Sequence, residues 1–149
     1  MKFPKKLNKL KLAFITGATK GIGRSTAITF ANAGWDLILL ARNMESMERL
    51  KSELVTTKSK ISLVKCDLSN SLEIDNCVKE AIKRYGCPSV LINNAGCAFN
   101  GSLVEMDLSQ WEQTMQINLT SVFQLCRSIV PQMRKNGGLV INVSSHASY

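Results

Sequence analysis

Short runs of consecutive apolar residues recur along the chain, separated by longer stretches of mixed character. The runs cover residues 12–15, 37–41, 61–64, 90–92 and 139–143. Their hydrophobicity is continuous rather than alternating, which is typical of strands buried on both faces of a parallel sheet. The pattern therefore predicts five buried strands.

The stretches between these runs have the spacing of amphipathic helices. Met47, Leu50 and Leu54 recur at intervals of three and four residues, and Ile74 and Val78 begin a second such series that extends to position 85. Each series gives its helix one apolar stripe that can pack on a sheet. Two helices are expected on each face of the sheet.

The longest helix is expected to follow residue 109. Ser109 and Glu112 have the spacing of a capping box, which predicts a start near Gln110. Pro131 is expected to kink or loosen the last turns, and the helix is expected to end before Asn136. Its predicted apolar stripe comprises Trp111, Met115, Leu119, Val122, Phe123, Cys126, Ile129 and Met133.

Strands that alternate with helices are typical of an α/β protein with a doubly wound parallel sheet. Because crossovers between parallel strands are right-handed, the simplest strand order is 3-2-1-4-5. With 149 residues, 45% of them hydrophobic, the chain has the size of one globular domain. We assign that domain to residues 11–149.

Composition narrows the classes of site and partner. No apolar run approaches the roughly 20 residues that span a bilayer, so we expect a cytoplasmic protein without a membrane partner. The five cysteines are an odd number without a Cys-x-x-Cys pair, and the chain has one histidine. This pattern favours reduced thiols over a disulfide framework, and no metal site is expected.

The net charge of +8 is partly concentrated in residues 1–10, a basic N-terminal arm. Such an arm can contact nucleic acid or another acidic surface, but a solvated terminus is the commoner case, and no nucleic-acid partner is expected. An excess of positive charge also suits a ligand that carries several phosphates.

A glycine-rich turn, residues 16–23, directly follows the first apolar run. Glycines at 17, 21 and 23 allow a tight turn, close approach to a pyrophosphate and close packing of the next helix. The free N–H groups and the dipole of that helix would face the anion. Glycines also mark ordinary turns, so the position between a strand and a helix is what favours a phosphate cradle.

Polar residues at the ends of the second and third strands extend this site. A dinucleotide site that prefers NAD usually has an acid after the second strand, where this chain has Arg42. Together with Lys20, Arg42 offers two cations for a 2′-phosphate, which favours NADP, although both can equally be surface charges. The Asp67 carboxylate can accept a hydrogen bond from an adenine amino group or cap the next helix.

Taken together and in order, these motifs resemble the N-terminal part of a short-chain dehydrogenase/reductase. The motifs are Thr16-Gly-x-x-x-Gly-x-Gly23, Asp67, Asn93-Asn94-Ala95-Gly96, Asn118 and Asn142-Val143-Ser144-Ser145. The resemblance covers residues 11–149. It implies a Rossmann-like fold and an NADP(H)-dependent oxidoreductase that interconverts a carbonyl and an alcohol by hydride transfer on a small-molecule substrate.

The resemblance also implies roles for single residues. Asn118 matches a catalytic asparagine that holds a water in a proton relay, and Ser145 matches a catalytic serine that hydrogen-bonds the substrate oxygen. We expect Asn118 to be buried within its helix and therefore to need hydrogen-bond partners. The residues expected to bind the cofactor are Gly17, Thr19, Lys20, Gly21, Ile22, Gly23, Arg42, Asp67, Leu68, Asn93, Ala95 and Gly96.

In this family a tyrosine and a lysine follow the serine, and the tyrosine acts as general acid or base. Tyr149 is only four residues after Ser145, too close to match that tyrosine, and His146 is more often a solvated residue. We expect the C-terminal strands of the sheet to be missing, so that the fifth strand is an exposed edge. A full-length protein would be a homo-oligomer, and a truncated one would associate or aggregate.

Three interpretations remain open. The first is the cofactor-binding part of an NADP-dependent reductase. The second is a catalytically inactive NADP-binding fragment that needs a partner. The third is a truncated product without function.

Overall fold

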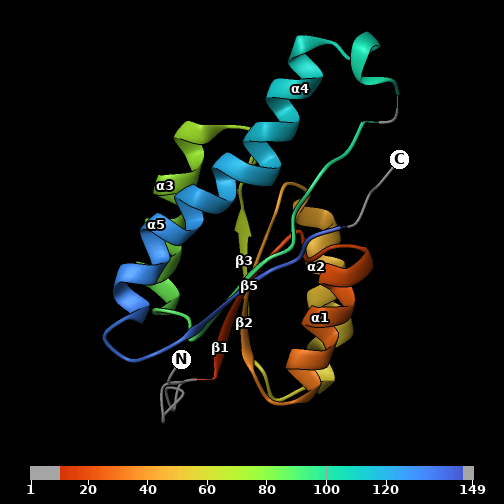
Figure 1. Ribbon diagram of the computed structural model, residues 1–149. Helices are drawn as coiled ribbons and strands as arrows, with labels where there is room; N and C mark the ends of the chain where they lie inside the picture. The colour runs from red at the N-terminus through yellow and green to blue at the C-terminus, as the bar shows by residue number, and fades with distance from the viewer. Residues whose placement is uncertain (1–10, 100, 146–149) are drawn as a thin grey trace.

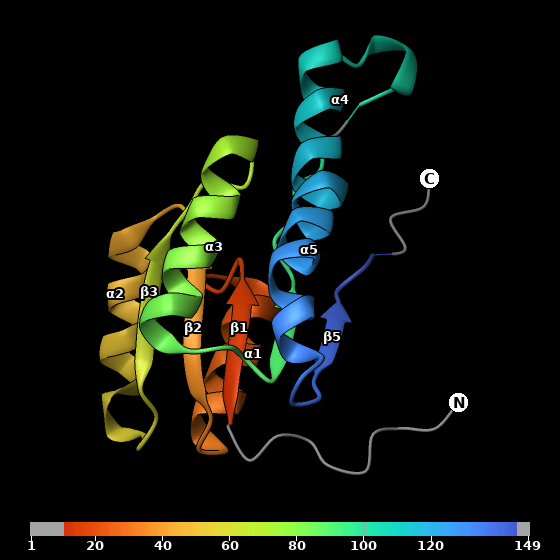
Figure 2. The same cartoon turned by 90° about the vertical axis from the view of Figure 1, so that its left-hand side faces the viewer.

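The computed structural model describes residues 11–99 and 101–145, and its centre is a five-stranded parallel sheet in the order β3-β2-β1-β4-β5 (Figure 2). The predicted order is confirmed, and every predicted strand is correct to within one residue at each end. The basic arm, residues 1–10, lies outside the described residues. The strands are β1 (Leu12–Thr16), β2 (Asp36–Ala41), β3 (Ile61–Lys65), β4 (Val90–Asn93) and β5 (Leu139–Asn142).

Two helices cover each face of the sheet, as predicted (Figure 1). Helices α1 (Gly21–Asn32) and α2 (Met44–Glu53) lie on one face, and α3 (Ser71–Tyr85) and α5 (Ser121–Met133) lie on the other. Successive residues of a strand point to opposite faces. Accordingly, Phe14 of β1 belongs to the α3/α5 side of the core, and its neighbours in the strand belong to the α1/α2 side.

The long helix begins at Leu108 and contains a wide turn. It consists of α4 (Leu108–Met115), the π-helical segment η3 (Gln116–Thr120) and α5. The predicted Ser109 cap is wrong, because the capping box is formed two residues earlier by Asp107 and Gln110. The Gln110 Oε1 atom accepts a hydrogen bond from the Asp107 N–H at 3.3 Å. Aspartate caps a helix as well as serine does, and the two pairs have the same spacing.

The predicted apolar stripe of this helix is only partly correct. Ile129 and Met133 are buried in the α3/α5 side of the core. The three largest discrepancies are Trp111, Leu119 and Phe123, which are 47%, 59% and 60% exposed. A π-turn holds one more residue than an α-turn and changes which residues share a face. Beyond η3 the buried positions of α5 include Ser121 and Leu125, which precede Ile129 at intervals of four.

The two edge strands differ from the three central ones. Helix α5 continues through Pro131 and ends at Met133, and a turn with Gly137 at φ +77° leads into β5. Leu139 and Ile141 are 49% and 37% exposed, so burial on both faces is wrong for β5. It is also wrong for β3, whose residues are half-buried or exposed. In the described part of the chain β5 pairs with β4 alone, which agrees with the expected exposed edge.

Two short 3₁₀ segments complete the fold, η1 (Leu54–Thr56) after α2 and η2 (Leu103–Glu105) before α4. Within residues 11–99 and 101–145, every helix is too short or too polar to cross a bilayer. In the same residues, no group of three or more His, Cys, Asp or Glu side chains is placed to hold a metal ion.

Candidate functional site

The turn between β1 and α1 needs its glycines for different physical reasons. A Cβ on Gly23 would lie 2.3 Å from Asn94 Nδ2 and 2.4 Å from the Gly17 carbonyl oxygen. A Cβ on Gly17 would lie 2.8 Å from Ala95 Cα. Gly21 has φ +54°, and a Cβ there would meet nothing within 4 Å. Glycines 17 and 23 therefore allow close packing, and Gly21 leaves open space in front of the turn.

The N-terminus of α1 has no side-chain cap. Lys20 is the N-cap residue, with extended backbone, and its side chain makes no capping hydrogen bond. The N–H of Arg24 donates to the Lys20 carbonyl at 3.2 Å. The amides of residues 21–23 precede this first helical bond, so they are the ones that a cap or a ligand must satisfy. Three such N–H groups at the positive end of a helix dipole are suited to an anion.

The ends of β1 and β4 are joined by side-chain hydrogen bonds. Thr16 Oγ1 accepts from the N–H groups of Asn94 and Ala95, both at 3.0 Å. Asn94 Nδ2 donates to the carbonyl oxygens of Thr16 and Gly17 at 3.0 and 3.1 Å. These bonds hold the glycine turn against the end of β4. Both Thr16 and Asn94 belong to motifs recognised in the sequence, but the hydrogen bonds between them were not predicted.

Asn93 joins the ends of β4 and β5. It is 3% exposed, and its Nδ2 donates to Asn142 Oδ1 at 2.8 Å, in the register that pairs the two residues. The same Nδ2 atom lies 3.6 Å from Cys126 Sγ of α5. The Asn93 side chain therefore steadies the strand end, and its backbone remains to line a ligand.

The two cations predicted to select NADP are both exposed. Neither Lys20 nor Arg42 forms an ion pair with a residue in the described ranges. By contrast, Arg24 on the first turn of α1 is bound to Glu53 at the end of α2. Lys20 and Arg42 are therefore the basic side chains at the ends of β1 and β2 that are available to a ligand.

Asp67 closes the turn that follows β3. Its Oδ1 accepts from the Ser69 N–H at 2.9 Å and from the Ser69 hydroxyl at 2.8 Å. Helix α3 is capped by Asn70 instead, whose side chain accepts from the Leu72 N–H at 3.1 Å. Of the two alternatives for Asp67, direct capping of the helix is thus wrong. The Leu68 side chain is buried in the core, which leaves its backbone to face a ligand.

Asn118 lies in the π-helical segment and is exposed, so the expectation that it is buried is wrong. Its hydrogen bonds are satisfied by one residue of the loop after β4. Asn118 Oδ1 accepts from the Cys97 N–H at 2.9 Å, and its Nδ2 donates to the Cys97 carbonyl at 2.8 Å. A Cβ on Gly96 would lie 3.4 Å from Asn118 Oδ1. Asn118 therefore holds this loop in place beside the end of β4.

Ser145 lies three residues beyond β5 and is exposed. Because the carboxyl ends of parallel strands meet at one edge of the sheet, Ser145 is on the same side as the glycine turn, Arg42 and Asp67. His146 and Tyr149 lie outside the described residues. The sequence-predicted site residues that follow a strand thus all lie at this edge of the sheet.

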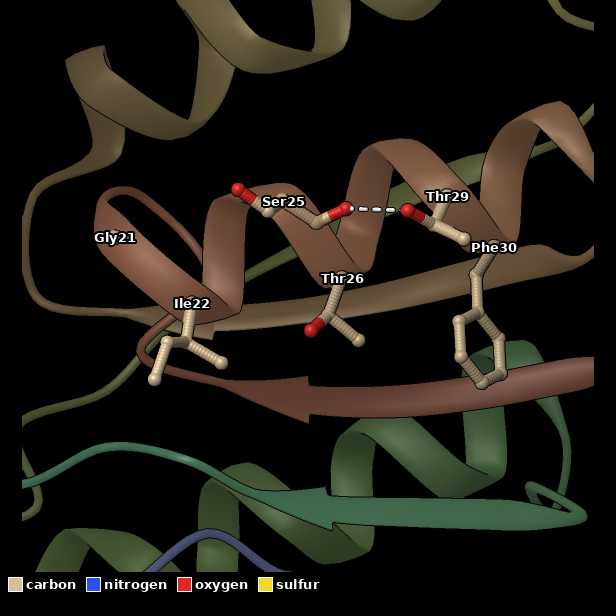
Figure 3. Close-up of a pocket in the computed structure, with 6 residues that line it drawn as sticks. All are labelled: Gly21, Ile22, Ser25, Thr26, Thr29 and Phe30. Atoms are coloured by element: carbon tan, nitrogen blue, oxygen red, sulfur yellow. Dashed lines mark hydrogen bonds between the residues drawn. The ribbon is translucent and has the colours of Figure 1, made fainter. Parts of the chain in front are cut away.

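A shallow hollow of about 570 Å³ follows the outer face of α1 (Figure 3). It begins at Gly21 and Ile22, and Ile22 is 64% exposed. The Thr29 hydroxyl donates to the Ser25 carbonyl at 2.9 Å within its lining. Because the six lining residues all belong to α1, this hollow is the side of one helix; of the predicted cofactor-binding residues it includes Gly21 and Ile22.

The family model for short chain dehydrogenases matches residues 11–149. The chain belongs to the short chain dehydrogenase family. A 3beta-hydroxysteroid dehydrogenase of Mediterraneibacter gnavus is 36% identical over 138 residues, which cover 92% of this chain and 50% of that protein. This short chain dehydrogenase sequence thus spans about half the length of the curated relatives it matches.

Solved structures of the family have the same fold. A metagenomic short-chain oxidoreductase in complex with NADP superposes with a TM-score of 0.88 at 31% identity, covering 95% of this chain and 65% of that one. L-sorbose reductase from Gluconobacter frateurii, complexed with NADPH and L-sorbose, gives a TM-score of 0.86 at 28% identity, covering 91% and 52%. The Rossmann-like architecture is therefore that of known short chain dehydrogenases.

Proposed function

We propose that this chain is the cofactor-binding part of an NADP(H)-dependent oxidoreductase that interconverts a carbonyl and an alcohol. The observation that carries the proposal is the N-terminus of α1, which follows a glycine turn and has no side-chain cap. A pyrophosphate there would accept from the first-turn amides and lie at the positive end of the helix dipole. Gly21, which has open space where a Cβ would be, allows the anion to approach the backbone.

The remaining cofactor contacts follow from the strand ends. We assign the 2′-phosphate to Lys20 and Arg42, because both are exposed cations without an ion-pair partner in the described residues. We assign the adenine to the Asp67 carboxylate and the Leu68 backbone, and the ribose to the backbone of Asn93 and of the loop that follows it. Thr19 and Ile22 flank the pyrophosphate from the turn itself.

The chemical end of the site would lie between Asn118 and Ser145. When bound, NADP(H) supplies or accepts the hydride. Ser145, whose hydroxyl is exposed at the carboxyl edge of the sheet, would donate a hydrogen bond to the substrate oxygen. Asn118, held at both its amide atoms by Cys97, would keep the loop after β4 in position beside the substrate.

A second function, cofactor binding without chemistry, is favoured by one observation. The tyrosine in the described ranges is Tyr85, the last residue of α3, which packs against the core. A helix that connects parallel strands ends at the amino edge of the sheet, opposite the edge at which Ser145 lies.

The cofactor assignment is tested by fluorescence titration of the protein with NADPH and NADH. We expect tighter binding of NADPH, and a loss of about tenfold in NADPH affinity for Lys20→Ala or Arg42→Ala with NADH affinity unchanged. Arg49→Ala is the matched control, because Arg49 is an exposed arginine that pairs with Glu45 within α2. Equal affinities for the two cofactors would contradict the roles of Lys20 and Arg42.

The two functions are separated by assaying NADPH oxidation against a panel of aldehydes and ketones. Removing one hydrogen-bond donor to an oxygen that gains charge in the transition state typically lowers kcat by about 10²–10³-fold, so turnover that Ser145→Ala reduces to this extent supports an enzyme. NADPH binding without turnover supports the cofactor-binding fragment.

A further inference from the structure

Two cysteines lie together where β3 leads into α3. Cys66 follows β3 directly and is 1% exposed, and Cys77, on the second turn of α3, is partly buried against the same core cluster. The Cys77 thiol donates to the Lys65 carbonyl oxygen at 3.6 Å. That oxygen belongs to the peptide group that joins Lys65 to Cys66. The Cys77 sulfur is therefore beside the backbone of Cys66, and both side chains pack on the same core cluster.

The backbone on both sides of this pair is fixed. The Cys66 N–H donates to the Ala41 carbonyl of β2 at 3.1 Å. The intervening turn is held by Glu73, whose carboxylate accepts from the Asp67 N–H at 3.3 Å.

The two sulfurs differ in accessibility. Burial raises the pKa of the Cys66 thiol, and the neighbouring Cys77 and the Glu73 and Asp67 carboxylates raise it further. Cys66 therefore remains a neutral thiol at neutral pH, enclosed by the core. Cys77 is the sulfur that a reagent from solvent meets first.

We propose that Cys66 and Cys77 form a redox-active dithiol site that takes small disulfides of the glutathione type. In the first step the Cys77 thiolate attacks one sulfur of oxidised glutathione, breaks its S–S bond and releases one glutathione thiolate. In the second, the Cys66 thiol passes its proton to the departing glutathione as its sulfur attacks Cys77 Sγ, so that the Cys66–Cys77 bond forms while the bond between Cys77 and glutathione breaks. The protein loses two electrons and two thiol protons, and two glutathione molecules are formed.

This site is independent of the nicotinamide cofactor, so its test does not depend on the proposed function. The folded protein is incubated with excess oxidised glutathione, quenched with acid, alkylated, digested and analysed by mass spectrometry. We expect the peptide pair cross-linked through Cys66 and Cys77 to be at least about tenfold more abundant than any other cross-link, with Cys87, Cys97 and Cys126 alkylated. The same treatment in concentrated urea is expected to abolish this preference.

Variants separate the two steps. Cys66→Ser is expected to retain one glutathione on Cys77, because the resolving sulfur is absent, and Cys77→Ser is expected to leave Cys66 unmodified. Cys87→Ser is the matched control, another partly buried thiol, and it should form the cross-link as the unaltered protein does. The proposal is overturned if the unaltered folded protein carries glutathione on Cys77 while Cys66 is alkylated. It is also overturned if the preference for the pair persists in urea.

Discussion

Helix α1 begins differently from helices α2 and α3, although all three follow strands of one sheet. Helices α2 and α3 start with Asn43 and Asn70, whose side chains accept from first-turn amides at 2.8 and 3.1 Å. Helix α1 starts with an uncapped Lys20 after a turn of glycines. In α2 and α3 a capping side chain accepts from an amide of the first turn. The first-turn amides of α1 have no such side-chain acceptor, so a ligand is expected to accept their hydrogen bonds.

The strongest test of this difference is Gly23→Ala. Its Cβ would lie within 2.4 Å of both Asn94 Nδ2 and the Gly17 oxygen, so we expect a loss of about 3 kcal/mol in the free energy of unfolding. Urea denaturation measures this loss. Ser25→Ala, an exposed position on the same helix, is the control and should change stability by less than about 0.5 kcal/mol. A Gly23→Ala protein as stable as this control would contradict the close packing.

The next largest effect is expected for Asn94→Ala. The change removes two hydrogen bonds from Nδ2 to the glycine turn, which corresponds to about 2 kcal/mol of stability. We expect weaker NADPH binding as well, because the turn is no longer held against β4. Asn76→Ala, an exposed asparagine on α3, serves as the control in the same denaturation and titration experiments. An Asn94→Ala protein that matches Asn76→Ala in both measurements would show that these bonds do not fix the cradle.

Gly21 and Gly34 provide a pair that separates stability from binding. Both have positive φ, +54° and +74°, and a Cβ on either would meet nothing within 4 Å. Alanine at either position should therefore cost a similar amount, about 1 kcal/mol. Only Gly21→Ala is expected to weaken NADPH binding, by about tenfold or more, because only Gly21 lies at the uncapped end of α1. An equal effect of the two variants on NADPH affinity would place the anion elsewhere.

The smallest expected effects compare the helix ends directly. Asn70→Ala removes the cap of α3 and should cost about 1 kcal/mol without changing NADPH affinity. Lys20→Ala removes no cap, so its effect on stability should stay below about 0.3 kcal/mol while NADPH binding weakens. Thermal unfolding and fluorescence titration of the two variants give opposite rankings if α1 is the ligand-binding helix end. If one variant had the larger effect on both stability and NADPH affinity, the start of α1 would not differ from that of α3 as a ligand-binding site.

The sequence was sufficient for the sheet because strands buried on both faces are visible as continuous apolar runs. This holds for β1, β2 and β4. It fails for the burial of β3 and β5, because each of these strands pairs on one side alone. Apolar spacing also located α2 and α3. Apolar spacing did not predict the buried face of the long helix, because the π-helical turn η3 holds more residues than the α-helical turns around it.

The site was predicted less completely than the sheet. Glycines 17, 21 and 23 could be recognised because the need for a small residue is local. The link between Thr16 and Asn94 joins residues 78 positions apart, and no local pattern reveals which side chain meets which carbonyl. The exposure of Asn118 was also unpredictable, since its partner is the backbone of Cys97, whose amide and carbonyl do not depend on residue type.

The π-helical segment has a consequence for how much this region tolerates changes in length. Removing one residue from η3 would convert the wide turn into an ordinary one and leave α4 and α5 in nearly the same relative orientation, because the wide turn takes up one extra residue. Helix α5 would keep its buried face, but the wide turn that presents the Asn118 amide to Cys97 would be lost, which would release the loop after β4. A single-residue deletion here would therefore separate folding from loop positioning. The extra residue of η3 thus serves the loop after β4 rather than the core.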